Sequence, residues 1–226
     1  MSKVHPADHR DFQDLLVKEV KVEGPPCTLT VWKRSSMSFQ GTDGFTVFDH
    51  HGRLVFRVDN YSRKNPRGPA GGLVLMDGTG NALLTLKPKI MSMQYQWNAY
   101  RGDQEMTRTR KAKKSKVFSM RTPSVLFQSR RKDEAEIFLD GLRRKGQMPD
   151  FRIQGSFRFR NCLIRTATGE VAAKIARKRI SSSVLLSDDV FSMVVQPGYD
   201  TELIMAFVVV LDRICARPFT PKLFLS

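Results

Sequence analysis

Apolar residues run without interruption over nine positions near the C-terminus, from Leu203 to Leu211. The residues before this run carry signals for the start of a helix. Pro197-Gly198 is a turn-forming pair, and the carboxylate of Asp200 can accept hydrogen bonds from free backbone N–H groups. Glu202 suits the positive end of a helix dipole. The pattern predicts a helix over about residues 201–215.

The same run has no polar face, and this decides where the helix must lie. A helix that is apolar all round has to be buried on every side. Nine apolar residues are also too few to cross a bilayer, which needs about 20. The three consecutive valines at 208–210 locally favour a strand instead. We favour a buried helix over a buried strand, and other elements must then surround it.

Three segments share one hairpin pattern. In each, four strand-like residues precede a polar turn, glycine occupies the eighth position, and apolar residues follow. Glycine fits a turn position that requires a positive φ. The spacing between the copies is too irregular for a solenoid, so the pattern predicts repeated antiparallel hairpins. The hairpins span residues 45–58, 73–86 and 162–175, and the shared glycines are Gly52, Gly80 and Gly169.

Further β-rich segments raise the expected number of strands to about twelve. Many short strands separated by turn residues are typical of a sandwich or a barrel, and the lumen of a barrel can enclose a helix. The sequence therefore predicts a mainly β fold: a closed antiparallel β-barrel of about 12 strands around one central hydrophobic C-terminal helix. The additional strands are expected at residues 28–32, 90–100, 117–121, 135–139, 151–159, 184–186 and 191–195.

The length of 226 residues allows one large β domain or two small ones. We expect a single barrel domain over residues 27–216, with a polar leader at 1–26 and a tail at 217–226. The leader has no apolar segment of the kind found in signal peptides, and the tail, broken by Pro218 and Pro221, is too short to span a bilayer.

Charge is the strongest compositional signal. The chain has 38 Lys and Arg residues against 22 Asp and Glu residues, a net charge of +16. Half of this surplus falls between Arg101 and Lys145, where 14 basic residues face 6 acidic ones. Such a surplus implies a polyanionic partner, which can be a nucleic acid, an anionic lipid surface or an acidic protein.

The basic residues form short clusters, and the densest lies in an expected loop over residues 101–116. Ordinary solubilising surface is the alternative to a binding role for each cluster. The loop contains no aromatic residue between 102 and 116 for stacking on bases, and no recognition helix is evident, which favours lipid over nucleic acid. Further clusters occur at 130–132 and 143–145. The candidate anion-binding or lipid-binding residues are Arg108, Arg110, Lys111, Lys113, Lys114, Lys116, Arg177, Lys178 and Arg179.

Catalytic and metal-binding patterns are weak. The histidines lie in the leader (His5, His9) or adjacent in a turn (His50, His51), without the spacing of metal ligands. Asp188-Asp189 is an acidic pair in an expected turn. We therefore expect no enzyme, no metal and no cofactor. The three cysteines, Cys27, Cys162 and Cys215, are expected to be small buried thiols in a reducing compartment, either cytosolic or nuclear.

An ordered series of short motifs resembles the plant LURP-one-related family, which has the Tubby C-terminal-like fold shared with phospholipid scramblases. The resemblance covers about residues 27–215, and it implies a barrel of about twelve strands threaded by one hydrophobic helix. The matching stretches are residues 29–33, 43–49, 56–61, 75–86, Trp97 with Tyr100-Arg101-Gly102, 194–200 and 208–214.

The resemblance also implies a role in plant pathogen defence, phosphoinositide binding, membrane tethering and release to the nucleus. Together with the charge, it favours a monomeric, non-enzymatic module that binds anionic phospholipid headgroups. We expect it in the cytoplasm, peripheral at the plasma membrane or nuclear. The alternative is a nucleic-acid-binding or transcription-associated protein. A scramblase role comes third, because it normally requires a membrane anchor.

Overall fold

The computed structural model describes residues 24–34, 44–60, 72–89, 95–101, 115–123, 133–140, 148–179 and 186–216. This part of the chain contains twelve strands and one helix. The first six strands are β1 (Cys27–Arg34), β2 (Gly44–Phe48), β3 (Leu54–Asn60), β4 (Leu73–Asp77), β5 (Ala82–Pro88) and β6 (Gln96–Arg101). The remaining elements are β7 (Lys116–Arg121), β8 (Asp133–Leu139), β9 (Phe151–Ser156), β10 (Asn161–Thr166), β11 (Val171–Arg177), β12 (Val190–Val195) and α1 (Thr201–Ala216).

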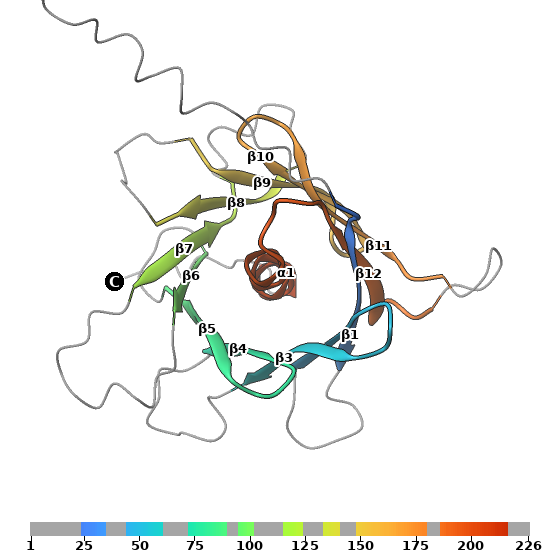
Figure 1. Cartoon of the computed structure of the whole chain (residues 1–226). Coiled ribbons are helices and arrows are strands. Elements are labelled where there is room, and N and C mark those ends of the chain that lie inside the picture. Colours follow the sequence, from blue (N-terminus) through green and yellow to red (C-terminus); the bar gives the residue numbers. More distant parts are fainter. Residues whose placement is uncertain are drawn as a thin grey trace, which may run out of the picture.

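The strands form one closed antiparallel barrel, and the helix runs through its lumen (Figure 1). Each strand pairs with the strand before it and the strand after it in the chain. The first and last strands close the barrel, with β1 against β12 from Cys27↔Val195 to Trp32↔Val190. The predicted fold class is confirmed.

The three hairpins predicted from their shared pattern are confirmed. Gly52, Gly80 and Gly169 all have positive φ, at 77°, 99° and 93°. In each hairpin the strand pairing shifts register between the third and fourth residues of the pattern, which marks a β-bulge at the same place. In the second hairpin, Asp77 Oδ1 accepts hydrogen bonds from the backbone N–H groups of residues 79–81. Hydrogen bonds from the side chains of Thr79 and Asn81 lower the pKa of Asp77 further.

A fourth hairpin, between β9 and β10, follows the same turn geometry with a different residue. The backbone N–H of Arg160 donates to the carbonyl of Phe157 at 3.0 Å, as Gly80 donates to Asp77 at 3.1 Å. Arg160 has a φ of 51°, and no other non-glycine residue in the described ranges has a positive φ. The predicted strand over residues 151–159 was too long at its C-terminal end, because the chain turns after Ser156.

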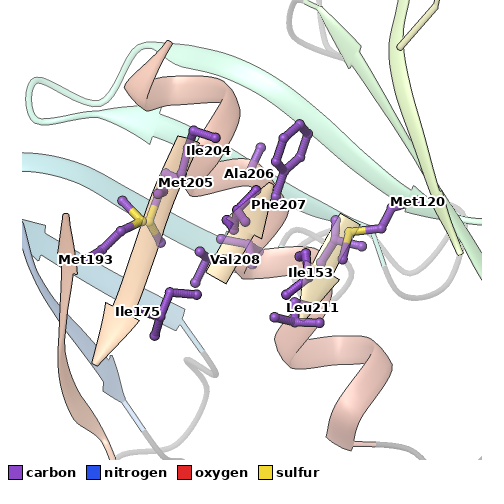
Figure 2. Packing of buried hydrophobic residues seen from close by; sticks show 14 of the residues in the cluster. Met120, Ile153, Ile175, Met193, Ile204, Met205, Ala206, Phe207, Val208 and Leu211 are labelled. Atoms are coloured by element: carbon purple, nitrogen blue, oxygen red, sulfur yellow. The ribbon is translucent and has the colours of Figure 1, made fainter. Parts of the chain in front are cut away.

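The helix begins and packs as predicted. Asp200 Oδ1 accepts hydrogen bonds from the N–H groups of Glu202, at 2.9 Å, and Leu203, at 3.3 Å. Every residue from Ile204 to Leu211 is fully buried, so the valine run packs as helix despite its local preference for strand. Figure 2 shows helix side chains such as Phe207 and Leu211 among residues of the barrel wall such as Ile153. Burial on all sides supplies the free energy that overrides the local preference.

The barrel has two ends that differ in their relation to the helix. We call the end at which α1 begins the amino rim; it carries the turns at residues 49–53, 78–81 and 167–170. We call the end at which α1 ends the carboxyl rim; it carries the turn at residues 157–160 and the ends of β1 and β11. The strands predicted at residues 28–32, 117–121, 135–139 and 191–195 are confirmed. The strand predicted at residues 90–100 begins at Gln96, and residues 90–94 lie outside the described ranges. Of the strand predicted at residues 184–186, only Leu186 is described, and it is not in a strand.

Net charge is low on this scaffold. The described ranges contain 18 of the 38 Lys and Arg residues and 14 of the 22 Asp and Glu residues. Three quarters of the net charge of +16 therefore belongs to the remaining segments, most of which connect neighbouring strands.

Candidate functional site

One of the candidate basic residues from the long loop is described, and it lies at the amino rim. Lys116 is the first residue of β7, and its Nζ pairs with Asp140 Oδ1 at 2.6 Å. Asp140, which directly follows β8, thus partly neutralises the charge of Lys116. The other five candidates of this loop, Arg108, Arg110, Lys111, Lys113 and Lys114, lie outside the described residues, as do the clusters at 130–132 and 143–145.

The second candidate set, residues 177–179, lies at the carboxyl rim, where β11 ends. Arg177 forms an ion pair with the carboxylate of Asp188. Lys178 reaches across β12 and donates from Nζ to Thr30 Oγ1 on β1, at 3.2 Å. Arg179 is exposed. Asp188 lies in a turn, as predicted.

The two candidate sets are separated by the height of the barrel. Lys116 stands at one end of its strand and residues 177–179 stand at the opposite rim. A six-residue strand alone spans about 20 Å. The structure therefore places Lys116 and residues 177–179 at opposite ends of the barrel, too far apart to share one flat surface.

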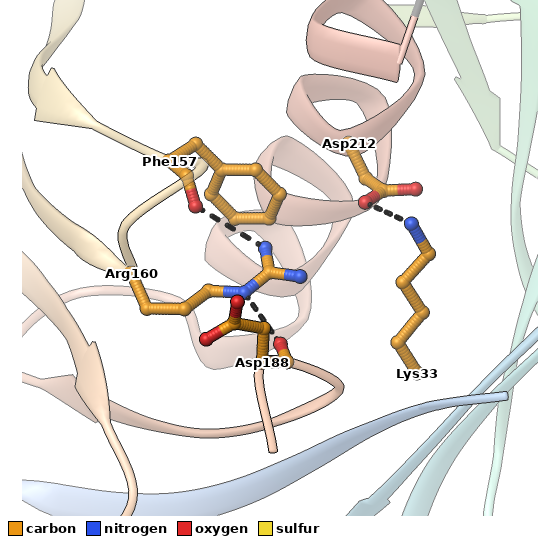
Figure 3. Close-up of polar contacts among 5 residues, drawn as sticks. All are labelled: Lys33, Phe157, Arg160, Asp188 and Asp212. Carbon is orange, nitrogen blue, oxygen red and sulfur yellow. Dashed lines mark hydrogen bonds and ion pairs between the residues drawn. The ribbon is translucent and has the colours of Figure 1, made fainter. Parts of the chain in front are cut away.

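A buried ionic cluster joins the helix to the barrel wall at the carboxyl rim (Figure 3). Asp212, in the last turns of α1, is only 4% exposed and accepts an ion pair from Lys33 at 2.9 Å. The backbone N–H of Lys33 donates to the carbonyl of Asp189 at 2.7 Å. Lys33 thus connects β1 to both the helix and the β11–β12 connection.

Arg160 occupies the centre of this cluster. Its guanidinium lies over the rings of Phe157 and Phe191, at 4.3 and 4.5 Å from their centroids. Its Nε donates to the backbone carbonyl of Asp188 at 2.9 Å. Burial lowers the pKa of Arg160, and the negative charges of Asp212 and Asp188 oppose that effect. Sequence analysis missed this residue because the predicted strand at residues 151–159 left no turn before it.

Exposed large apolar side chains divide between the rims according to type. Phe159, at the tip of the β9–β10 turn, is 69% exposed, and Trp32, near the end of β1, is 49% exposed; both lie at the carboxyl rim. Leu54 and Met148, the other two in the described ranges, lie at the amino rim and are aliphatic. The exposed aromatic residues therefore share an end with Arg177, Lys178 and Arg179.

The cysteines are free thiols, and one of them is buried. Burial raises the pKa of Cys162 to about 12, which keeps its thiol protonated. Cys27 and Cys215 are exposed, so the prediction of burial was wrong for these two. Cys27 is the first residue of β1 and Cys215 lies near the end of α1. At such positions, apolar neighbours in the sequence do not guarantee that a side chain is buried. The thiol of Cys215 donates to Glu134 at 3.4 Å, and its partial desolvation beside that carboxylate raises its pKa.

The other candidate chemistry shows no assembled site in the described ranges. His50 and His51 are exposed in the β2–β3 turn, with ring centroids 3.8 Å apart, whereas His5 and His9 lie outside the described residues. In the part of the chain that the structure describes, no group of three or more metal-ligating side chains converges. Nor does any helix there have the length and apolar character needed to cross a membrane.

The fold defines a class of protein: a closed β-barrel whose lumen is filled by its own C-terminal helix. Comparison with known proteins agrees with this class. The family model described as LURP-one-related matches residues 27–212. The chain belongs to the LURP-one-related family.

Individual relatives cover nearly the whole chain. Protein LURP-one-related 5 from Arabidopsis thaliana is 38% identical over 202 residues, which are 88% of this chain and 89% of that protein. Protein LURP-one-related 17 from the same plant is 31% identical over 87% of each chain. A solved X-ray structure of an Arabidopsis thaliana protein matches with a TM-score of 0.56 at 21% identity, covering 84% of this chain and 92% of that one, and it supports the fold alone.

Proposed function

We propose that the protein is a non-enzymatic interaction module that binds anionic phospholipid headgroups, phosphoinositides among them. One observation carries the proposal: the lumen is filled by α1, whose residues 204–211 are fully buried, while most of the surplus positive charge belongs in sequence to segments outside the strands and the helix. A filled lumen directs binding to the exterior, and the exterior carries the charge that attracts polyanions.

The charge suffices for reversible attachment to a membrane. Near an anionic leaflet each Lys or Arg contributes about 1 kcal/mol, so four to six of them at one face hold a soluble domain there reversibly. The candidate set at residues 108–116 contains six basic residues. The set at 177–179 contains three, and Asp188 offsets one of them.

We further propose that this binding tethers a regulator in plant defence or signalling, located in the cytoplasm and peripherally at the plasma membrane or in the nucleus. Family membership supports this part. A nucleic-acid-binding role is the second candidate, because a run of positive charge such as residues 108–116 can also follow a phosphate backbone.

Cosedimentation with vesicles tests the proposal. The wild-type chain is incubated at physiological salt with phosphatidylcholine vesicles that contain or lack a phosphoinositide. Selective sedimentation with the phosphoinositide supports the proposal, and equal absence from both pellets contradicts it. A duplex DNA mobility shift run in parallel supports the second candidate instead if affinity for DNA is specific in sequence and falls steeply with salt.

A matched variant identifies the contribution of the long loop. Replacing Arg108, Arg110, Lys111, Lys113 and Lys114 with glutamine removes its charge, while Lys116 is retained because it pairs with Asp140. We refer to this chain as the loop-neutral variant. Its binding relative to wild type shows whether the basic residues at 108–114 take part.

A further inference from the structure

We propose that the carboxyl rim is the face that docks on an anionic bilayer, with Phe159 entering the headgroup region and the basic residues beside it contacting lipid phosphates. This inference rests on the proposed lipid binding and adds the orientation of the barrel. We define the docking sector as Trp32, Arg158, Phe159, Lys178 and Arg179.

Strand pairing places these residues next to one another. Asn161 of β10 pairs with Ala176 of β11, so the turn that precedes Asn161 lies beside the residues that follow Ala176. Arg158 and Phe159 are in that turn, and Lys178 and Arg179 are in those following residues. Asp188 connects the two segments, since its backbone carbonyl accepts from Arg160 and its carboxylate pairs with Arg177.

The turn is held so that Phe159 points away from the core. Phe157 and Arg160 on either side are buried, whereas Arg158 and Phe159 between them are exposed. The backbone N–H of Phe157 donates to both carboxylate oxygens of Glu134 at 3.0 Å, which attaches the turn to β8. Because the turn is already ordered, insertion of Phe159 carries little further cost in conformational entropy.

Trp32, the second aromatic residue of the sector, also lies at the carboxyl rim. Trp32 is an outward-facing residue of β1, where it pairs with Val190 of β12. Lys178 spans the intervening strand by its hydrogen bond to Thr30, two residues before Trp32. Exposed tryptophan and phenylalanine beside lysine and arginine suit the interface between water and lipid, where an aromatic ring and a cation are both favourably placed.

The charge of the sector is positive after its acidic neighbours are counted. This part of the rim carries four positive charges, on Arg158, Arg177, Lys178 and Arg179, and two negative ones, on Asp188 and Asp189. The carboxylate of Asp188 pairs with Arg177, and the carboxylate of Asp189 offsets one of the three remaining positive charges. In the described residues, Arg158 and Arg179 make no ion pair, so both are available to lipid phosphates.

The sequence that follows the helix has the same character. Because α1 ends at this rim, the chain continues from the carboxyl rim into its last ten residues. That segment contains two basic residues, Arg217 and Lys222, and two aromatic residues, Phe219 and Phe224. At the amino rim, by contrast, the exposed large apolar residues in the described ranges are aliphatic.

Substitutions at the two rims test the orientation on the full chain. On vesicles of phosphatidylcholine with phosphatidylserine and phosphatidylinositol bisphosphate, we expect Phe159→Ala to weaken binding about tenfold. Met148→Ala, which removes an equally exposed apolar residue at the other rim (65% against 69%), should bind as wild type. Arg158→Glu should weaken binding more than the loop-neutral variant does. Unchanged thermal unfolding shows that each variant is folded.

Trp32 also serves as an insertion probe, because the other tryptophan, Trp97, is buried in the core. Docking by the carboxyl rim predicts a blue shift of tryptophan emission and quenching by lipids brominated on their acyl chains. The proposal is overturned, with lipid binding intact, if Phe159→Ala and Arg158→Glu bind as wild type while the loop-neutral variant does not. It is also overturned if brominated lipids do not quench the emission of Trp32 in the vesicle-bound chain and soluble inositol phosphate or DNA releases the chain from the vesicles. Absence of wild-type binding to these vesicles overturns both proposals.

Discussion

Lys33 and Asp212 form an ion pair at 2.9 Å although 179 positions separate them in the chain. One stands at the end of the first strand and the other in the last turns of the helix. The pair therefore joins the N-terminal strand of the domain to its C-terminal helix at the carboxyl rim. Asp212 is buried, so its carboxylate loses hydration on folding, whereas Lys33 is 30% exposed and keeps part of its hydration. The ion pair with Lys33 offsets the cost of burying the carboxylate.

Loss of this partner should destabilise the fold. We expect Lys33→Met to lower the free energy of unfolding by about 1 to 3 kcal/mol, less than for a fully buried pair because Lys33 retains some water. Chemical denaturation measures the change. The double variant Lys33→Met with Asp212→Leu should regain much of the loss, since no unpaired carboxylate remains buried. A single variant as stable as wild type contradicts this account of the pair.

Arg160 permits a test of strain separate from a test of contacts. Arg160→Gly and Arg160→Ala both remove the guanidinium, its stacking on Phe157 and Phe191, and its hydrogen bond to Asp188. Only alanine keeps the cost of a left-handed conformation at a φ of 51°. We expect both to be less stable than wild type, and alanine to be less stable than glycine by about 1 kcal/mol. Equal stabilities would show that the turn relaxes.

Two glycines with similar φ values separate backbone strain from steric contact. At Gly169 a Cβ atom has no neighbour within 4 Å, so Gly169→Ala should cost about 1 kcal/mol from the positive φ alone. At Gly155, with a φ of 107°, a Cβ atom meets the carbonyl oxygen of Asn161 well inside contact distance. Gly155→Ala should therefore cost clearly more, and paired thermal unfolding of the two variants decides. A reversed order would contradict the geometry of the β9–β10 pairing.

The buried thiol predicts a dependence of stability on pH. In the folded state the pKa of Cys162 is about 12, raised from about 9 in the unfolded chain. A raised pKa stabilises the fold fully below pH 9, and this contribution is lost as the pH rises from about 9 towards 12. Cys162→Ala should reduce the loss of stability over this window. Alkylation at neutral pH should modify the exposed Cys27 first and Cys162 only on unfolding.

The fully buried segment of α1, residues 204–211, should not tolerate a charged residue. Val209 is fully buried, so Val209→Asp places a carboxylate in the core and should abolish soluble expression. Val209→Leu serves as the control, because it keeps the position apolar and changes only volume. A normally folded Val209→Asp chain would refute the placement of α1.

The fold was predictable because its signals are local and periodic. The run from Leu203 to Leu211 has no polar face, and Gly52, Gly80 and Gly169 each mark a turn that requires positive φ. The β9–β10 turn escaped prediction because Arg160 adopts the conformation that glycine adopts in the other three hairpins. Its contacts with β12 compensate for that strain, and such contacts leave no local pattern in sequence.

The sequence predicted which basic clusters the chain contains, but it did not predict which rim each cluster occupies. Net charge and clusters can be counted in a sequence, but which rim a cluster occupies depends on strand direction. Barrel closure places Lys116 and Arg177 at opposite ends, and it brings Phe159 beside Lys178. The ion pairs of Lys116 and Arg177 likewise depend on partners in other strands or connections.

The central claim is that this barrel binds anionic phospholipid through its exterior, and one titration tests it most directly. The wild-type chain is titrated at physiological salt with phosphatidylcholine vesicles that contain phosphatidylinositol bisphosphate, and with vesicles of phosphatidylcholine alone. We predict saturable binding to the first and none to the second, with affinity falling as salt is raised. No binding to either, or equal binding to both, would contradict the account.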